Sequence, residues 1–256
     1  MTEQITEKPV EKVADAASQA VRAESAPAPV RRYRALVFRS ALLLVVVAFA
    51  VLTFLVKTMP SFAIDLQITR GIQMINLPIF AWLMNTLSWP GFTPQSMIIA
   101  GLITVLIYGF GLHWESVMAL IAAVFSTAIN LLVKDLVQRP RPASSLVNVY
   151  TTLTSYSFPS GHVMFYLGFF GFIWFLAFTL LKPSIKRTIL LLFFGILIGL
   201  IGISRIYVGE HWASDVLGAY LLGTLTLVAI IQFYIWGKTR FFVHQPAAAA
   251  EPTQTK

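Results

Sequence analysis

The stretch TILLLFFGILIGLIGI-SRIYVGEHWASD-VLGAYLLGTLTLVAIIQFYIW, residues 188–236, places two long apolar runs on either side of a short polar motif. An apolar run of about 20 residues can cross a bilayer as a helix. The motif between the runs carries Arg205, His211 and Asp215. Charged or imidazole side chains beside such apolar segments are costly unless they have a function. The stretch therefore predicts two membrane helices joined by a functional segment.

The composition of the whole chain agrees with a membrane protein. Its 256 residues are 57% hydrophobic and 12% charged, whereas a soluble domain is about 45–50% apolar and about 25% charged. Cysteine is absent, which excludes disulfides, thiolate catalysis and Cys-based metal sites. The net charge of +8 comes from basic residues scattered at the ends of apolar runs. Membrane topology and anionic lipid explain that charge better than a nucleic-acid partner.

Six apolar runs predict an all-α, polytopic fold with six transmembrane helices. The expected spans are residues 37–56, 94–112, 116–133, 163–181, 188–203 and 216–236. Residues 58–93 mix apolar and polar positions and are expected to form an interfacial amphipathic or re-entrant segment, with a seventh span as the alternative. The membrane domain is expected at residues 36–240. Residues 1–35, which lack an apolar face, are expected to form a disordered tail, and residues 241–256 a second tail.

The distribution of basic residues predicts the orientation in the cell membrane. An even number of spans puts both termini on one side, and that side carries nine Lys or Arg residues: Arg31, Arg32, Arg34, Arg39, Lys182, Lys186, Arg187, Lys238 and Arg240. Outside the motifs, the opposite side carries two, Lys57 and Arg70. Because cytoplasmic loops are enriched in Lys and Arg, we expect both termini in the cytoplasm and the motif loops on the extracytoplasmic side.

Two further motifs lie in the loop between the third and fourth spans. They are KDLVQRPRP, residues 134–142, and PSGH, residues 159–162. In any six-span arrangement, this loop and the loop between spans five and six lie on the same face of the membrane. The three motifs can therefore converge, and together they supply the fixed cations, two histidines and one carboxylate that are suited to handling a phosphoryl group.

Each motif also has a simpler interpretation when it is taken alone. His211 and Asp215 share a helix face at i, i+4, so the carboxylate can orient the imidazole, but the pair could equally be an interfacial helix start. PSGH could be an ordinary helix cap. The loop cations could meet lipid headgroups, and Arg205 could snorkel to the interface. Arg139 and Arg141 both precede a proline, so the residues themselves leave both open as ligands.

The combined pattern Lys-x6-Arg-Pro, Pro-Ser-Gly-His and Ser-Arg-x5-His-x3-Asp resembles that of the type 2 phosphatidic acid phosphatase superfamily, which also includes the vanadium haloperoxidases. The six-span layout is similar to the membrane-embedded lipid phosphatase branch, and the resemblance covers about residues 36–240. It implies that the Lys-x6-Arg spacing selects Arg141 rather than Arg139.

The resemblance also implies a role for each matched residue. The phosphate-binding residues would be Lys134, Arg141, Ser160, Gly161 and Arg205. The catalytic residues would be His211, Asp215 and His162. His211 would be the nucleophile that forms a phosphohistidine, and Asp215 would orient it. His162 would protonate the leaving oxygen and then activate the hydrolytic water. No metal ion and no cofactor are implied. We expect Glu210, beside His211, to form a local salt bridge rather than to act in catalysis.

The function expected on this basis is an integral membrane lipid phosphatase acting on a lipid phosphate or pyrophosphate within the bilayer. Undecaprenyl pyrophosphate, phosphatidic acid and phosphatidylglycerol phosphate are the candidate substrates, and no residue distinguishes them. The alternatives are a lipid phosphotransferase that uses the same site and a non-enzymatic scaffold or transporter. A haloperoxidase is disfavoured, because those relatives are soluble.

Overall fold

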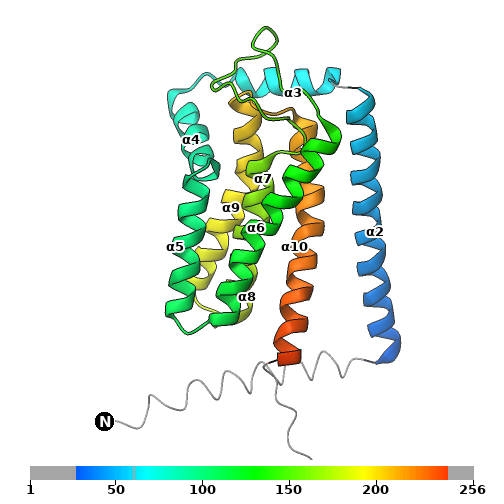
Figure 1. Ribbon diagram of the computed structural model, residues 1–256, viewed down its shortest axis with the longest axis vertical. Helices are drawn as coiled ribbons and strands as arrows, with labels where there is room; N and C mark the ends of the chain where they lie inside the picture. The colour runs from blue at the N-terminus through cyan, green and yellow to red at the C-terminus, as the bar shows by residue number, and fades with distance from the viewer. Residues whose placement is uncertain (1–26, 60, 242–256) are drawn as a thin grey trace, which may run out of the picture. The chain divides into compact units, whose positions relative to one another are not determined.

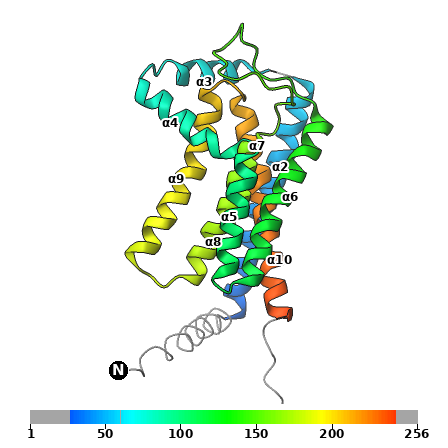
Figure 2. The ribbon, with the colours of Figure 1, turned by 60° about the vertical axis from the view of Figure 1, so that its left-hand side comes forward.

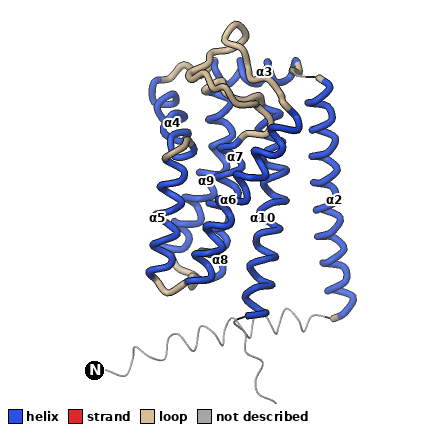
Figure 3. Tube along the Cα trace, viewed as in Figure 1, coloured by secondary structure: helices blue, strands red, loops and turns tan. Residues whose placement is uncertain are grey.

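The computed structural model describes residues 27–59 and 61–241 of the chain, and all regular structure within these ranges is helical (Figure 3). The expected all-α fold is therefore confirmed. Most of the two expected tails, residues 1–35 and 241–256, lies outside the described residues. In chain order the helices are α2 (Ala28–Thr58), α3 (Ala63–Gln73), α4 (Pro78–Ser88), η1 (Trp89–Gly91), α5 (Gln95–Gly109), α6 (His113–Val137), α7 (Gly161–Phe165), η2 (Tyr166–Phe170), α8 (Gly171–Leu180), α9 (Ile185–Tyr207) and α10 (Ala213–Phe241).

Five of the described helices are long and apolar enough to cross a membrane. They are α2, α6, the continuous run Gly161–Leu180, α9 and α10. The segments Pro78–Gly91 and Gln95–Gly109 meet at a 66° bend and make a sixth span when they are counted together. The protein is thus a multi-pass membrane protein. The expected second span is α5, which is short by itself. The expected interfacial or re-entrant segment, residues 58–93, contains α3, α4 and η1, and the last two belong to the bent pair.

The chain divides into two units within α2, between Val47 and Ala48. The described part of the first unit is a single helical stretch, mostly apolar beyond its basic start. The second unit contains the rest of α2 and all other described helices. All three sequence motifs belong to this second unit.

The most buried span is the run Gly161–Leu180, which the PSGH motif begins. Of the 18 most apolar consecutive residues of this run, 67% are buried, compared with 33% for the corresponding 18 residues of α10. Its close approach to α6 depends on Gly168, where a Cβ would lie 1.9 Å from Ser126 Oγ. The phenol of Tyr166 donates a hydrogen bond of 2.6 Å to the carbonyl of Leu87 at the end of α4. The core therefore fixes the start of this helix against its neighbours.

The polar motifs gather at one end of the second unit. Figure 1 shows α3 lying across this end, next to the long loop that joins α6 to α7, and Figure 2 shows the same arrangement from another side. The ends of α6 and α9 and the starts of α7 and α10 meet here. The connection between α8 and α9 lies at the opposite end.

Candidate active site

His211 and Asp215 lie at the centre of the candidate site, where α9 leads into α10. Both side chains are buried, with relative exposures of 1% and 0%. Asp215 Oδ2 is 3.6 Å from His211 Nδ1, which is longer than a hydrogen bond. Such contacts are often loose in a free enzyme and shorten when substrate binds. The carboxylate is thus placed to orient the imidazole through Nδ1, which leaves Nε2 on the side of the ring away from Asp215.

Ser157 bridges the same pair and was not among the residues that the sequence predicted. Its hydroxyl donates a 2.5 Å hydrogen bond to Asp215 Oδ2 and is 3.5 Å from His211 Nδ1. The backbone N–H of Trp212 donates a further hydrogen bond of 2.9 Å to Asp215 Oδ2. Since Ser157 belongs to no motif and lies in an irregular loop, its spacing carried no signal.

The two arginines of the first motif have different environments. Arg141 lies at the other nitrogen of the imidazole, with one guanidinium nitrogen 3.3 Å from His211 Nε2. It is held there by hydrogen bonds to the carbonyls of Ser155 and Glu210, at 2.7 and 2.6 Å. Arg139 is 1% exposed and forms an ion pair with Asp215 Oδ1 at 2.5 Å. The geometry thus separates two residues that the motif alone left equivalent.

Asp65 of α3 also reaches this site, although no sequence motif predicted a role for it. It is 1% exposed, and its Oδ2 pairs with the second guanidinium nitrogen of Arg139 at 2.8 Å. Its carboxylate also accepts hydrogen bonds from Ser214, at 2.8 Å from the backbone N–H and at 2.6 Å from the hydroxyl. Arg139 therefore links two buried carboxylates that are far apart in the sequence.

Helix α6 supports the first two motifs together. Lys134, 6% exposed, donates a hydrogen bond to the carbonyl of Tyr156 in the α6–α7 loop. One turn earlier, the Asn130 amide donates to the carbonyl of Pro159 at 3.0 Å. Its oxygen lies 3.1 Å from the place that a Cβ on Gly161 would take. Gly161 thus lets the PSGH backbone approach α6 closely, and Asn130 is a second residue that the motifs did not reveal.

Two buried polar atoms of the PSGH motif have no hydrogen-bond partner among the described residues. They are Ser160 Oγ and His162 Nε2, on side chains with relative exposures of 0% and 8%. Buried polar groups in proteins are nearly always hydrogen-bonded, so these atoms are well suited to meet a polar ligand. The ring of His162 packs edge-on against Phe92 with a centroid distance of 4.6 Å.

Arg205, at the end of α9, is fully buried and completes the group of cations. One guanidinium nitrogen donates to Ser88 Oγ at 2.8 Å, and another pairs with Glu210. The guanidinium also lies over the Phe92 ring, 5.1 Å from its centroid. The expected local salt bridge of Glu210 is thus confirmed, and its partner is a predicted phosphate ligand.

The site combines positive charge with a neutral imidazole. Burial, together with the nearby cations Arg141, Lys134 and Arg205, holds the pKa of His211 well below its usual range. Burial also lowers the pKa of Arg141, while Asp215 opposes that shift. His211 is therefore uncharged at neutral pH, with an available nitrogen in a field that attracts anions. A neutral imidazole in a positive field is suited to nucleophilic attack on a phosphoryl group.

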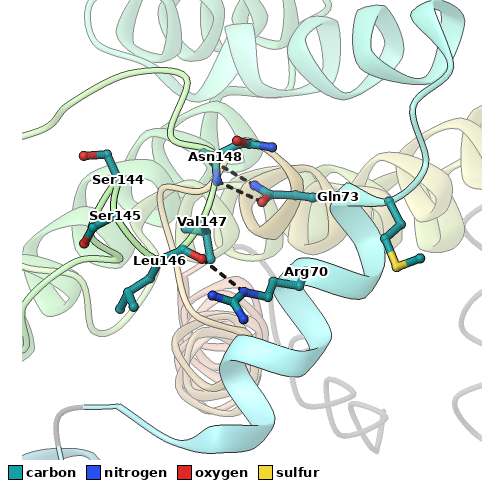
Figure 4. Close-up of a pocket in the computed structure, with 8 residues that line it drawn as sticks. Arg70, Gln73, Ser144, Ser145, Leu146, Val147 and Asn148 are labelled. Carbon is teal, nitrogen blue, oxygen red and sulfur yellow. Dashed lines mark hydrogen bonds between the residues drawn. The ribbon is translucent and has the colours of Figure 1, made fainter.

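Helix α3 also holds the loop that follows Arg141. Figure 4 shows the amide of Gln73 hydrogen-bonded to both backbone groups of Asn148, at 2.7 and 3.0 Å, and Arg70 bonded to the carbonyl of Leu146 at 3.2 Å. Gln73 donates a further hydrogen bond of 2.8 Å to the carbonyl of Tyr207 at the end of α9. An open cavity of about 370 Å³ lies between α3 and this loop.

Comparisons with known proteins agree with this arrangement. The model of the PAP2 superfamily matches residues 113–238. Phosphatidylglycerophosphatase B of Bacillus subtilis (strain 168) is 27% identical over 190 residues, which cover 72% of this chain and 90% of that protein.

Two solved structures share the fold. The transmembrane PAP2 type phosphatidylglycerolphosphate phosphatase from Bacillus subtilis superposes with a TM-score of 0.68 at 24% identity, covering 79% of this chain and 98% of that one. LpxE from Aquifex aeolicus gives a TM-score of 0.52 at 23% identity, covering 68% and 98%. The family match spans the region that contains all three motifs. Residues 113–238 of this chain thus form a PAP2 superfamily segment.

Proposed function

We propose that this protein is an integral membrane phosphatase that hydrolyses a lipid phosphate or pyrophosphate. One observation carries the proposal: the uncharged, buried His211 presents Nε2 3.3 Å from Arg141, in the field of Arg141, Lys134 and Arg205. The name of the 27% identical relative, a phosphatidylglycerophosphatase, supports the same class of substrate.

In the proposed mechanism, Lys134, Arg141 and Arg205 bind the non-bridging phosphoryl oxygens, with further hydrogen bonds from Ser160 and the Gly161 N–H. Fixed cations of this kind stabilise the charge that develops in phosphoryl transfer. For this reason we also propose that catalysis needs no divalent metal ion.

His211 Nε2 attacks phosphorus, and a P–N bond forms as the P–O bond to the lipid breaks. His162, which takes up a proton when the anionic phosphoryl group binds beside it, gives that proton to the departing oxygen. Water then attacks the phosphohistidine, His162 takes a proton from that water, and the P–N bond breaks to release phosphate. Throughout, Asp215 orients His211 through Nδ1.

A lipid rather than a soluble ester is favoured by an apolar groove between α5 and α6. This cavity of about 440 Å³ is lined mainly by apolar residues, with Phe165 among them and Thr93 at one end. Thr93 follows Phe92, whose ring contacts His162. An acyl or prenyl chain can lie in this groove while its phosphate reaches the histidines.

The test is phosphate release by the purified protein in detergent with EDTA present. The panel compares phosphatidic acid, phosphatidylglycerol phosphate, undecaprenyl pyrophosphate and diacylglycerol pyrophosphate with a water-soluble phosphate ester. We expect release from at least one lipid, little from the soluble ester, and loss of activity in His211→Ala. Full activity in His211→Ala would refute the mechanism, an absolute need for Mg²⁺ would refute metal independence, and inactivity on every lipid would refute the function.

A further inference from the structure

The side chain of Asp65 makes its polar contacts outside its own helix, beside the residues of the candidate site. It lies on α3, whereas its side-chain partners among the described residues are Arg139 of the α6–α7 loop and Ser214 at the start of α10. A buried carboxylate is costly unless it is paired and hydrogen-bonded, and both conditions are met here.

Arg139 connects Asp65 to the carboxylate beside the nucleophile. A guanidinium is a rigid fork that prefers to bind both oxygens of one carboxylate. Here the fork is divided: one nitrogen takes Asp215 Oδ1 at 2.5 Å and also donates to Ser214 Oγ at 2.7 Å, while the other takes Asp65 Oδ2 at 2.8 Å. Asp215 therefore keeps Oδ2 for Ser157, for the Trp212 N–H and for the side facing His211 Nδ1.

We propose that Asp65 is a positioning residue for the phosphatase reaction: by holding one arm of Arg139, it leaves the second oxygen of Asp215 facing the nucleophilic histidine. Without the Asp65 charge, both arms of Arg139 turn to Asp215 and draw that oxygen away from His211. The effect on catalysis rests on the proposed function, whereas the effect on the imidazole does not.

A purely structural role for Asp65 is the competing explanation, since it also accepts the Ser214 N–H at the start of α10. Asp65→Asn separates the two explanations. The amide has the same shape and keeps an oxygen for the Ser214 N–H, but it loses the charge that holds Arg139. A helix-capping role therefore survives this substitution, and the positioning role does not.

Thr69 supplies the matched control. It is one turn further along the same helix, is fully buried, and its hydroxyl donates only to the Asp65 backbone carbonyl, at 2.9 Å. Thr69→Val removes a buried hydroxyl from α3 without touching Arg139. We expect near-wild-type kcat in Thr69→Val and a kcat lower by about ten- to a hundredfold in Asp65→Asn, with little change in KM.

A second substitution tests the route through Arg139. The double variant Asp65→Asn/Arg139→Gln lacks the guanidinium as well as the Asp65 carboxylate, so one positive and one negative charge are removed together. Without the guanidinium, nothing draws Asp215 Oδ2 away from His211. We expect the double variant to be faster than Asp65→Asn alone. Because the two residues are in contact, their effects are not expected to add. A double variant slower than Asp65→Asn contradicts the route through Arg139.

The state of the imidazole provides a readout independent of any substrate. In protein carrying ¹⁵N-histidine, the His211 signals are identified by their loss in His211→Ala. We expect one tautomer, protonated on Nδ1, in the wild type and a mixture in Asp65→Asn. Wild-type kcat and an unchanged tautomer in folded Asp65→Asn would overturn the proposal, as would a double variant slower than the single one. If no lipid is hydrolysed even by the wild type, the proposed function fails, and the tautomer alone decides the role of Asp65.

Discussion

At the scale of single residues, Arg139 and Arg141 show how neighbouring cations take different tasks. Arg139 is enclosed by Asp65 and Asp215, so its charge is already balanced within the protein. Arg141 is only partly buried and contacts backbone carbonyls, a serine and the ring of His211, with no carboxylate among its hydrogen-bond partners. Of these two arginines, Arg141 is therefore the one whose positive charge is available to a phosphoryl group.

The low pKa of His211 leads to a prediction about pH. His211 must be neutral to attack, so its active form is lost as the pH falls through its folded-state pKa. That pKa lies well below the usual value of about 6.5 because of burial and the adjacent cations, Arg141 first. Arg141→Gln removes one cation, so the pKa of His211 rises and the acid limb of kcat/KM moves to higher pH, along with a loss of rate.

The measurement is the pH profile of kcat/KM for both enzymes on one lipid substrate, whose own ionisation affects the two profiles equally. Arg240→Gln, at the far end of α10, is the control and should keep the wild-type acid limb. An acid limb in Arg141→Gln that is unchanged or moved to lower pH contradicts the electrostatic role given to Arg141.

The sequence revealed those site residues whose identity and spacing form a pattern, and the structure brings them together at one end of the helices. The sequence did not predict Ser157, Asn130 or Asp65, because each acts through a contact between segments far apart in the chain. A lone serine in a loop, an asparagine in an apolar helix and an aspartate in an amphipathic segment have many simpler explanations. Only tertiary packing shows that these three side chains face the motifs.

At the scale of elements, the break between α4 and α5 is more than a connection. Apolar periodicity predicted a span and an adjoining interfacial segment, but it could not show that the break packs against the site. The bend places Gly91 and Phe92 directly against the His162 ring, and Phe92 also lies beneath Arg205. The broken helix therefore forms one wall around the proposed acid–base residue.

This wall predicts a large effect from a single methyl group. A Cβ on Gly91 would lie 2.2 Å from His162 Cδ2, so the imidazole must move in Gly91→Ala. Displacing a proton donor by about 1 Å can cost a factor of about 100 in rate, and we expect a loss of about ten- to a hundredfold in kcat. Gly109→Ala is the control, since a Cβ there meets no atom within 4 Å.

The measurement is kcat alongside the thermal unfolding temperature in detergent for both variants. Because the strain is local, Gly91→Ala should stay folded while its kcat falls. Equal kcat values for the two alanine variants would show that His162 is not held by this wall.

At the scale of the whole molecule, the basic residues are distributed unevenly between the membrane faces that we infer. The short α8–α9 connection is flanked by Lys182, Lys186 and Arg187, whereas the cations near the α6–α7 loop are mostly engaged in the site. By the positive-inside rule, we expect the α8–α9 connection to face the cytoplasm. We therefore propose that the active site opens on the extracytoplasmic side, where it meets lipids of the outer leaflet.

This orientation is testable because the chain contains no cysteine, so each introduced thiol reports alone. Ser144 and Pro183 are exposed and lie in the α6–α7 loop and the α8–α9 connection, at opposite ends of the second unit. In intact cells, a membrane-impermeant maleimide should label Ser144→Cys, and it should label Pro183→Cys only after the membrane is opened. Neither position takes part in the site, so phosphate release by each variant shows that the labelled protein is folded. The reverse labelling pattern would place the active site in the cytoplasm, and the site would then draw its substrate from the inner leaflet.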